Sequence, residues 1–240
     1  MSTDRYRHPA SVVDEAINRL KDRIGAGDFA PGSQLPPEAV LAADLNLSRL
    51  SLREAVRALV MAGVLEVRRG TGTFVTDLKP DRLVGAIGRF LELADDTAVG
   101  ELFECRRILE PGATALAATR ISAPQLAAVA EKLARMRSVR DPEELVREDL
   151  DFHAAIVAAT GNLTLRSLAA SVAQHTARAR IWRAAVKTDV FDWTHKQHTE
   201  IYDALVAHDS LAAFTAATRH VTEVEQWVRQ RLEAEPPDQD

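Results

Sequence analysis

The sequence has little cysteine, few aromatic residues and no long apolar run. Cys105 is the one cysteine among 240 residues, so the chain cannot form an internal disulfide or a cluster of thiolate ligands. No apolar stretch approaches the roughly 20 residues of a membrane span, and the first residues lack the apolar core of a signal peptide. With 46% hydrophobic and 27% charged residues, we expect a globular cytoplasmic protein without a membrane partner.

The sequence also lacks the excess of positive charge that is typical of nucleic-acid-binding proteins. Its formal net charge is −5, but the charge is unevenly distributed. Residues 1–78 contain ten basic and ten acidic residues, whereas 79–240 contain twenty and twenty-five. Within 49–69, five arginines accompany only two glutamates. Positive charge is therefore concentrated in one segment, and the negative total does not exclude DNA as a partner.

The first 80 residues predict three short helices and a β-hairpin. Ser11 and Ser48 are suited to cap the first and third helices, and Gly63 suits the left-handed position that ends the third. In the second helix we expect Val40 to point inward with the apolar residues that follow it. The expected elements are helices at about 11–26, 36–46 and 48–63 and strands at 64–67 and 73–76.

From residue 81 to about 231 the periodicity is helical, and no strand-like alternation appears. The six or seven expected helices lie at about 81–94, 97–119, 123–138, 142–160, 163–187, 194–208 and 210–231. The predicted fold class is therefore mainly α. We expect an N-terminal winged helix-turn-helix domain at 1–78, an all-helical bundle at 79–232 and an acidic tail at 233–240.

Two short helices followed by a basic hairpin have the layout of a winged helix-turn-helix. Arg49, Arg53 and Arg57 follow one another at single-turn spacing on one face of the third helix, and arginine can contact guanine in the major groove. The alternative is an arginine-rich helix face that is merely solvated. The candidate DNA-binding residues are Ser48, Arg49, Ser51, Arg53, Arg57, Arg68, Arg69, Gly70, Thr71 and Gly72.

This segment resembles the GntR family of bacterial regulators over about residues 24–76. The matching runs are 27–36, 41–42, 47–49, 53–56 and 70–75. The resemblance implies that Arg49 and Arg53 contact DNA and that Gly70 and Gly72 lie at the tip of the wing. Ala39 departs from the pattern, because many members have a DNA-contacting arginine there.

The second part of the chain contains six of the seven histidines. Asp149 and His153 are four residues apart, on one face of a predicted helix. His198 and His220 are equally far from the turn at 208–210, so in two antiparallel helices they would meet at the same height. One carboxylate and three imidazoles suit a divalent metal, most simply Zn²⁺, with Ni²⁺ or Mn²⁺ as alternatives. The alternative, which spacing alone does not exclude, is that the aspartate and the three histidines are ordinary surface or core residues.

The same part resembles the FCD effector domain of the FadR-type GntR subfamily, over about 95–230. The matching residues are Arg106, Leu109, Glu110, Ala117, Ala118, Asp149, Phe152, His153, Gly161, Asn162, His198, Ile201, Ala204, Leu205 and Asp209. The resemblance implies a helical bundle, a metal held by Asp149, His153, His198 and His220, and a small organic or sugar acid as effector. It also implies that Arg106 faces the effector cavity.

The alternative for Arg106 is a surface ion pair with Glu110, four residues on. His195 is a candidate neighbour of the metal, and the candidate effector-binding residues are Arg106, Glu110, Asn162 and His195. A helix face with His175, Arg178 and Trp182 would line the cavity, although ordinary packing explains these three equally well.

Together these patterns predict a transcription regulator, most simply a repressor, whose affinity for DNA depends on a small carboxylate effector beside a metal. We expect a homodimer on a palindromic double-stranded DNA operator, because one recognition helix and wing cover only a half-site. One alternative is a metal-dependent enzyme fused to a DNA-binding domain, although no motif singles out a general base. A DNA binder without an effector is another, and a solidly packed helical core would favour it.

Overall fold

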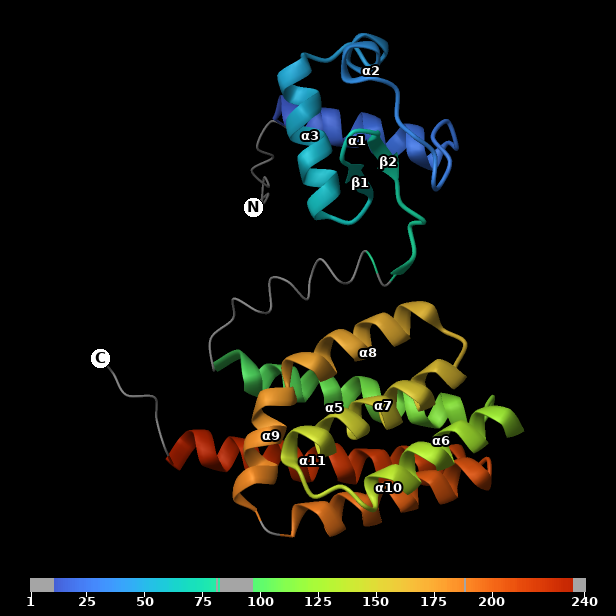
Figure 1. Cartoon of the computed structure of the whole chain (residues 1–240), viewed down its shortest axis with the longest axis vertical. Coiled ribbons are helices and arrows are strands. Elements are labelled where there is room, and N and C mark those ends of the chain that lie inside the picture. The colour runs from blue at the N-terminus through green and yellow to red at the C-terminus, as the bar shows by residue number, and fades with distance from the viewer. Residues whose placement is uncertain (1–10, 81, 83–96, 188, 235–240) are drawn as a thin grey trace, which may run out of the picture. The chain divides into compact units, whose positions relative to one another are not determined.

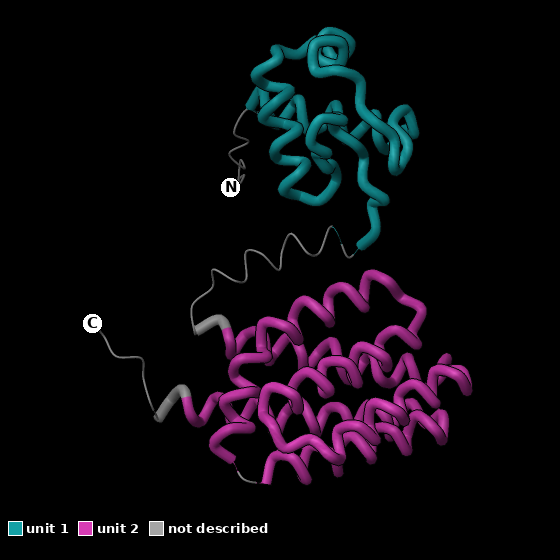
Figure 2. Tube along the Cα trace, viewed as in Figure 1, with its two compact units in different colours: residues 1–86 teal, residues 87–240 magenta. Residues whose placement is uncertain are grey.

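The computed structural model describes residues 11–80, 82, 97–187 and 189–234 (Figure 1). The chain forms two compact units, residues 1–86 and 87–240 (Figure 2). The first contains helices and one two-stranded sheet, and the described part of the second is helical. This confirms the predicted fold class. The helix expected at 81–94 and most of the expected acidic tail lie outside the described residues, and no described helix is long and apolar enough to cross a membrane.

The N-terminal unit is built from α1 (Val12–Gly25), α2 (Glu38–Asp44), α3 (Arg49–Met61), β1 (Leu65–Arg68) and β2 (Gly72–Val75). Helices α1 and α3 pack together because their apolar stripes, which include Leu20 and Leu52, are fully buried. The Ser48 Oγ accepts a hydrogen bond from the backbone N–H of Ser51 at 3.0 Å and so begins α3. Gly63, with a φ of 76°, ends it. The Ser11 Oγ likewise accepts a hydrogen bond from the backbone N–H of Asp14 at 3.1 Å and begins α1, so all three predicted caps are confirmed.

The inward orientation predicted for Val40 is wrong, since 58% of this residue is exposed. Helix α2 is short, and it buries Leu41, Ala42 and Leu45 instead. Successive residues are rotated by about 100° around a helix axis, so Val40 and Ala42 lie on opposite sides of Leu41. The buried face of α2 is centred between Leu41 and Ala42, and Val40 therefore points toward solvent.

The wing is a hairpin whose strands each begin and end one residue away from the expected positions. A third segment joins it, because the backbone N–H of Leu35 donates to the carbonyl of Thr73 at 2.8 Å. At Gly72 the φ is 132°, and a Cβ atom would lie 2.6 Å from Nε2 of Gln34. This position therefore favours glycine for its backbone conformation, whereas the exposed Gln34 side chain could move away from a Cβ atom.

The C-terminal unit contains α5 (Thr97–Ala118), α6 (Ala123–Met136), α7 (Pro142–Ala159), α8 (Leu163–His175), α9 (Ala177–Val186), α10 (Val190–Val206) and α11 (Ser210–Ala234). Helices α5 and α11 lie side by side (Figure 1). Helix α7 packs against α5, α6, α8 and α9. Polar side chains on its inner face, among them Asp149 and His153, are therefore buried.

The single helix expected at 163–187 is two helices, α8 and α9, which run in different directions (Figure 1). They meet at the buried Thr176, whose hydroxyl donates to the carbonyl of Ala173 at 3.0 Å. Nη2 of Arg180 donates to the same carbonyl at 2.8 Å. Because side chains use this carbonyl, the backbone ladder is interrupted and the chain changes direction. Helical periodicity did not reveal the break because both halves are amphipathic.

Candidate metal centre and nucleic-acid interface

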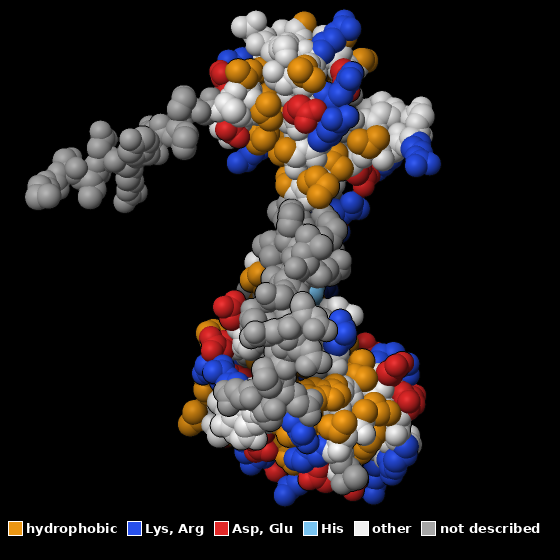
Figure 3. Space-filling view, turned by 90° about the vertical axis from the view of Figure 1, so that its left-hand side faces the viewer, with side chains coloured by type: hydrophobic (Ala, Val, Ile, Leu, Met, Phe, Trp, Pro, Cys, Tyr) orange, Lys and Arg blue, Asp and Glu red, His pale blue; other side chains and the backbone are white. Residues whose placement is uncertain are grey.

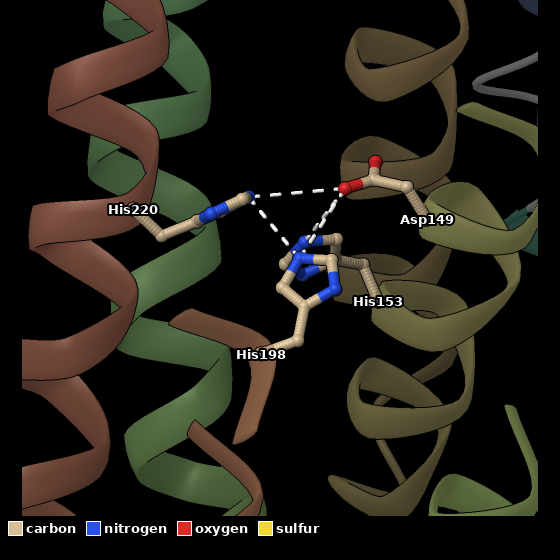
Figure 4. A group of neighbouring side chains, drawn as sticks. All are labelled: Asp149, His153, His198 and His220. Atoms are coloured by element: carbon tan, nitrogen blue, oxygen red, sulfur yellow. Dashed lines mark hydrogen bonds and ion pairs between the residues drawn. The ribbon is translucent and has the colours of Figure 1, made fainter. Parts of the chain in front are cut away.

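Asp149, His153, His198 and His220 lie together inside the C-terminal unit (Figure 4). Helix α7 supplies the first two from successive turns, while α10 and α11 supply one histidine each. All four residues are buried, and one potential ligand atom from each lies within 4.8 Å of the others. The structure thus brings together the four residues that the sequence singled out as a metal-binding group, called the ligand cluster below.

The turn between α10 and α11 explains how the two distant histidines meet. Helix α10 ends at Val206, and His208 then adopts a left-handed conformation, with a φ of 51°, before α11 begins at Ser210. Nε2 of His198 and Nε2 of His220 lie 3.3 Å apart. Equal distance from the turn therefore places both side chains at the same height, as the spacing predicted.

Three imidazole nitrogens surround one oxygen of Asp149. Its Oδ1 lies 3.3 Å from Nε2 of His198 and 3.7 Å from Nε2 of His153. Nε2 of His220 is 3.8 Å from the same oxygen. Ligand atoms placed tetrahedrally at about 2.1 Å from a zinc ion are about 3.4 Å apart. The four side chains could therefore hold a divalent metal once they draw closer together.

Neighbouring side chains orient two of the imidazoles. The Nδ1 of His220 lies 3.0 Å from Oε1 of Gln197, and the Nδ1 of His198 lies 3.4 Å from the sulfur of Met136. A proton on each Nδ1 leaves the Nε2 lone pair free for a metal. The Nε2 of His153 is buried and has no hydrogen-bond partner among the described residues. A metal would satisfy this buried nitrogen.

The electrostatics of the ligand cluster favour the protonation states that a metal needs. Burial lowers the pKa of His198 to about 4 and holds the pKa of His220 well below its usual value. Burial alone would raise the pKa of Asp149, but the Arg180 guanidinium and the nearby imidazoles hold it well below its usual range. At neutral pH His198 and His220 are therefore neutral and Asp149 is ionised, as in metal-bound ligands.

Gln197 offers a first test of this arrangement. We expect Gln197→Ala to weaken Zn²⁺ binding by about 10- to 100-fold, because His220 loses the group that fixes its tautomer and ring orientation. Competition with a chromophoric chelator measures the affinity. Lys196→Ala is the matched control, since Lys196 is the exposed neighbour on the same helix. Equal affinities for both variants would contradict an orienting role for Gln197.

Arg106 and Glu110 form an ion pair beside the ligand cluster. Nε of Arg106 donates to Oε1 of Glu110 at 2.6 Å, and Nη2 donates to Oε2 at 3.1 Å. Only 1% of Arg106 and 3% of Glu110 are exposed. The pair that was the alternative for Arg106 is thus made, but in the interior and not on the surface. Glu110 also lies 3.9 Å from Nδ1 of His153, so it provides negative charge next to a candidate ligand.

Two other predicted effector residues lie outside the ligand cluster. Asn162 is exposed, and its Oδ1 accepts a hydrogen bond from the backbone N–H of Leu165 at 3.0 Å, so it caps α8. His195 is half-buried one turn before His198. In this structure Asn162 therefore has a local structural role, and His195 is a neighbour of the cluster on α10.

The helix face that was expected to line the cavity is displaced by the break at Thr176. Arg178 is exposed, and Trp182 packs edge-on against Trp227 with ring centroids 5.1 Å apart. Arg180 is buried instead and forms an ion pair with Asp149. Sequence reasoning missed Arg180 because counting along one unbroken helix assigns it to another face.

A cavity of about 220 Å³ adjoins the ligand cluster, because His153 belongs to the cluster and also lines the cavity. Glu110 also lines this cavity. Its remaining lining comes mainly from α7 and α8: Leu150, Asp151, Ala154, Val157, Arg166, Ala169, Ala170, Ala173 and Gln174. Pockets for drug-sized ligands are about 300–1,000 Å³, so this one suits a smaller organic molecule. The core of the unit is therefore not packed solid.

On the N-terminal unit, Arg49, Arg53 and Arg57 are all exposed on α3. Figure 3 shows Lys and Arg side chains gathered on the surface of this unit. Nη2 of Arg53 lies 2.9 Å from Oε2 of Glu38, which is an ion pair that the sequence analysis did not identify. Arg49 has no ion-pair partner in the part of the chain that the structure describes. These guanidinium groups are accessible to a duplex.

The wing presents further basic groups. Arg68 pairs with Glu66, and its guanidinium carbon lies 4.1 Å from the centroid of the Phe74 ring. Arg69 and Thr71 are exposed at the turn. The Ser48 hydroxyl is used as the cap of α3, whereas Ala39 is exposed next to Glu38 and offers no polar group. Of the positions proposed for DNA contact, those on α3 and the wing are thus largely on the surface.

Comparisons with known proteins identify two family models that match different parts of the chain. Residues 12–75 match the family model described as bacterial regulatory proteins, gntR family, and residues 101–223 match the FCD domain. The HTH-type transcriptional regulator LutR of Bacillus subtilis is 30% identical, over 84% of this chain and 94% of LutR. The HTH-type transcriptional repressor NanR of Edwardsiella tarda is 26% identical, over 90% and 83%. The solved structure of Streptococcus agalactiae GntR is similar with a TM-score of 0.67 and 29% identity, covering 90% of this chain and 99% of that one.

Proposed function

The chain belongs to the GntR family of bacterial regulatory proteins and carries an FCD domain, and from this premise we propose how its DNA binding is controlled. It is a DNA-binding transcription regulator that responds to a small molecule, and it is not an enzyme. Our proposal concerns the chemistry of the response: a small organic or sugar acid binds beside a divalent metal in the C-terminal unit.

The observation that carries this proposal is the convergence of three Nε2 atoms on one carboxylate oxygen of Asp149. Buried imidazoles without a shared ligand would be costly, because a polar nitrogen is left without a partner. We propose Zn²⁺ as the metal, since it favours nitrogen and oxygen ligands in a tetrahedral arrangement; Ni²⁺ and Mn²⁺ are alternatives. The bound metal would supply a Lewis acid to which a carboxylate of the effector binds.

The second element of the proposal is a homodimer on a palindromic operator. Helix α3 would lie in the major groove with Arg49 and Arg53 toward base edges, and the wing would contact the phosphate backbone. An effector that binds one conformation of the dimer more tightly than the other shifts the spacing of the two α3 helices. Because NanR is named a repressor, we propose repression that the effector relieves.

Two measurements test the proposed function. Mass spectrometry under native conditions should find a dimer with one metal per chain, together with any acid that copurifies. The operator is then selected from random duplexes, and gel shifts with a panel of organic acids should show release of DNA that a chelator abolishes. A metal-free protein whose affinity for DNA responds to no acid would refute the proposal.

A further inference from the structure

Arg183, on α9, is a buried cation that makes no ion pair with any of the described residues. Only 4% of it is exposed, and its Nε has no hydrogen-bond partner among the described residues. Within the same residues no carboxylate lies at ion-pair distance from its guanidinium. Its guanidinium carbon lies 4.2 Å from the centroid of the Trp193 ring, and Asp189, Asp149 and Glu223 act on it only through longer-range attraction. Buried charges are normally paired, so this arginine calls for an anion.

The neighbouring arginines do not share this property. Arg106 is neutralised by two hydrogen bonds to Glu110, and Arg180 by its ion pair with Asp149. Of these three buried guanidinium groups, Arg183 is therefore the one that makes no ion pair within the described residues. A divalent metal in the ligand cluster would add two further positive charges. With that metal bound, the groups around Arg183 would attract an anion from outside the chain.

Arg183 also lies next to the ligand cluster. It lines a small cavity, of about 20 Å³, together with Arg180, Asp149 and His220. This is about the space that one water molecule requires. An oxygen held in the cavity would face two guanidinium groups and two members of the ligand cluster at once. The cavity is separate from the larger one beside His153, with which it shares no lining residue.

We propose that Arg183 binds a carboxylate of the effector, in a subsite formed by this small cavity. Arg106, which the sequence analysis favoured for that role, instead holds Glu110 beside His153. The inference rests on the proposed function in so far as the effector is an acid. To admit a whole carboxylate, the small cavity must widen, and the Arg183 guanidinium must turn away from Trp193. An acid with two carboxylates suits the surplus of positive charge better than one with a single carboxylate.

The test uses the full-length protein and three probes, malonate, acetate and sulfate, titrated calorimetrically with and without Zn²⁺. We expect Arg183→Gln to bind malonate about 10- to 100-fold more weakly than the unaltered protein, which is the effect of losing one charge-assisted pair. Arg178→Gln is the matched control, because Arg178 is an exposed arginine on the same helix. It should change the affinity less than twofold. Arg183→Lys should recover part of the malonate binding.

Thermal unfolding separates this role from a structural one. Without an anion, Arg183→Gln should be at least as stable as the unaltered protein, because it removes an uncompensated buried charge. Loss of stability in both Arg183→Gln and Arg183→Lys would show that the arginine supports the fold, and would overturn the proposal. The proposal would also be overturned if Arg183→Gln bound malonate as tightly as the unaltered protein, or if the unaltered protein bound no malonate. Equal binding of sulfate and malonate would indicate an inorganic counter-ion and would overturn it as well. Malonate binding that depends on Arg183 in protein that binds no metal would uphold this inference while refuting the metal site.

Discussion

Replacing His220 with alanine is expected to lower Zn²⁺ affinity by at least about 100-fold. A structural zinc site contributes about 10–16 kcal/mol through four ligands, so one ligand accounts for roughly 3 kcal/mol or more. The remaining residues cannot compensate, since each of them already contributes its one ligand atom to the cluster. Metal content after purification, and titration of the metal-free protein, measure the loss. His153→Ala should behave in the same way, because it removes a nitrogen that faces the same oxygen.

The same variant should lose the stabilisation that the metal provides. Zn²⁺ present at 1,000 times its dissociation constant stabilises the folded state by about 4 kcal/mol if it does not bind the unfolded chain. For a chain of this size, that corresponds to an increase in Tm of roughly 10 °C. The control is His195→Ala, which alters a half-buried histidine of α10 outside the ligand cluster. If His220→Ala kept a full complement of metal, the ligand cluster would not be a metal site.

The ligand cluster could be predicted because its geometry is set by local rules. Asp149 and His153 share a face through the period of a single helix, whatever surrounds that helix. His198 and His220 are related by one turn, and equal distances from a turn give equal heights in a helical hairpin. No long-range information is needed for either step beyond the packing of α7 against the rest of the unit.

The residues that surround the cluster could not be predicted in the same way. Gln197 precedes a ligand in the sequence, and its amide reaches the other histidine of the pair only because α10 and α11 pack closely. Arg180 and Arg183 point inward because α9 changes direction at Thr176. That change depends on competition for a single carbonyl, which leaves no mark on apolar periodicity. Apolar periodicity therefore did not single out Arg180 and Arg183 as buried residues beside the ligand cluster.

On the N-terminal unit the sequence predicted the helices and the exposed arginines but not the ion pair between Arg53 and Glu38. The pair joins α2 to α3, and its geometry depends on how the two helices cross. It lowers the pKa of Glu38 through the hydrogen bond from Arg53. Both side chains are about half exposed, so the pair contributes little to stability. Its effect is on the position of Arg53, whose side chain is held near the N-terminal end of α2 before DNA arrives.

Alanine at Arg49 or Arg53 is expected to weaken binding to the selected operator by about 5- to 150-fold each. A bidentate arginine contact to guanine is worth about 1–3 kcal/mol of discrimination against the wrong base. Ala39 offers no polar side-chain group to a base, so we expect base reading by this unit to depend on fewer side chains. Gel shifts with the operator and with a scrambled duplex measure the loss. Specific binding should fall more than binding to the scrambled duplex, because the contacts that are removed read bases.

Arg57→Ala and Arg147→Ala are the comparison variants for this prediction. Arg57 lies two turns into α3 with its charge paired to Glu54, so its removal should weaken binding to both duplexes alike and reduce the salt dependence by about one phosphate contact. Arg147 is exposed on the C-terminal unit and should have no effect. Removing an arginine that reads bases changes the ratio of specific to nonspecific affinity. Removing an arginine that binds phosphate lowers both affinities by the same factor and leaves the ratio unchanged. If Arg49→Ala and Arg53→Ala left that ratio unchanged, α3 would not be the element that recognises the operator.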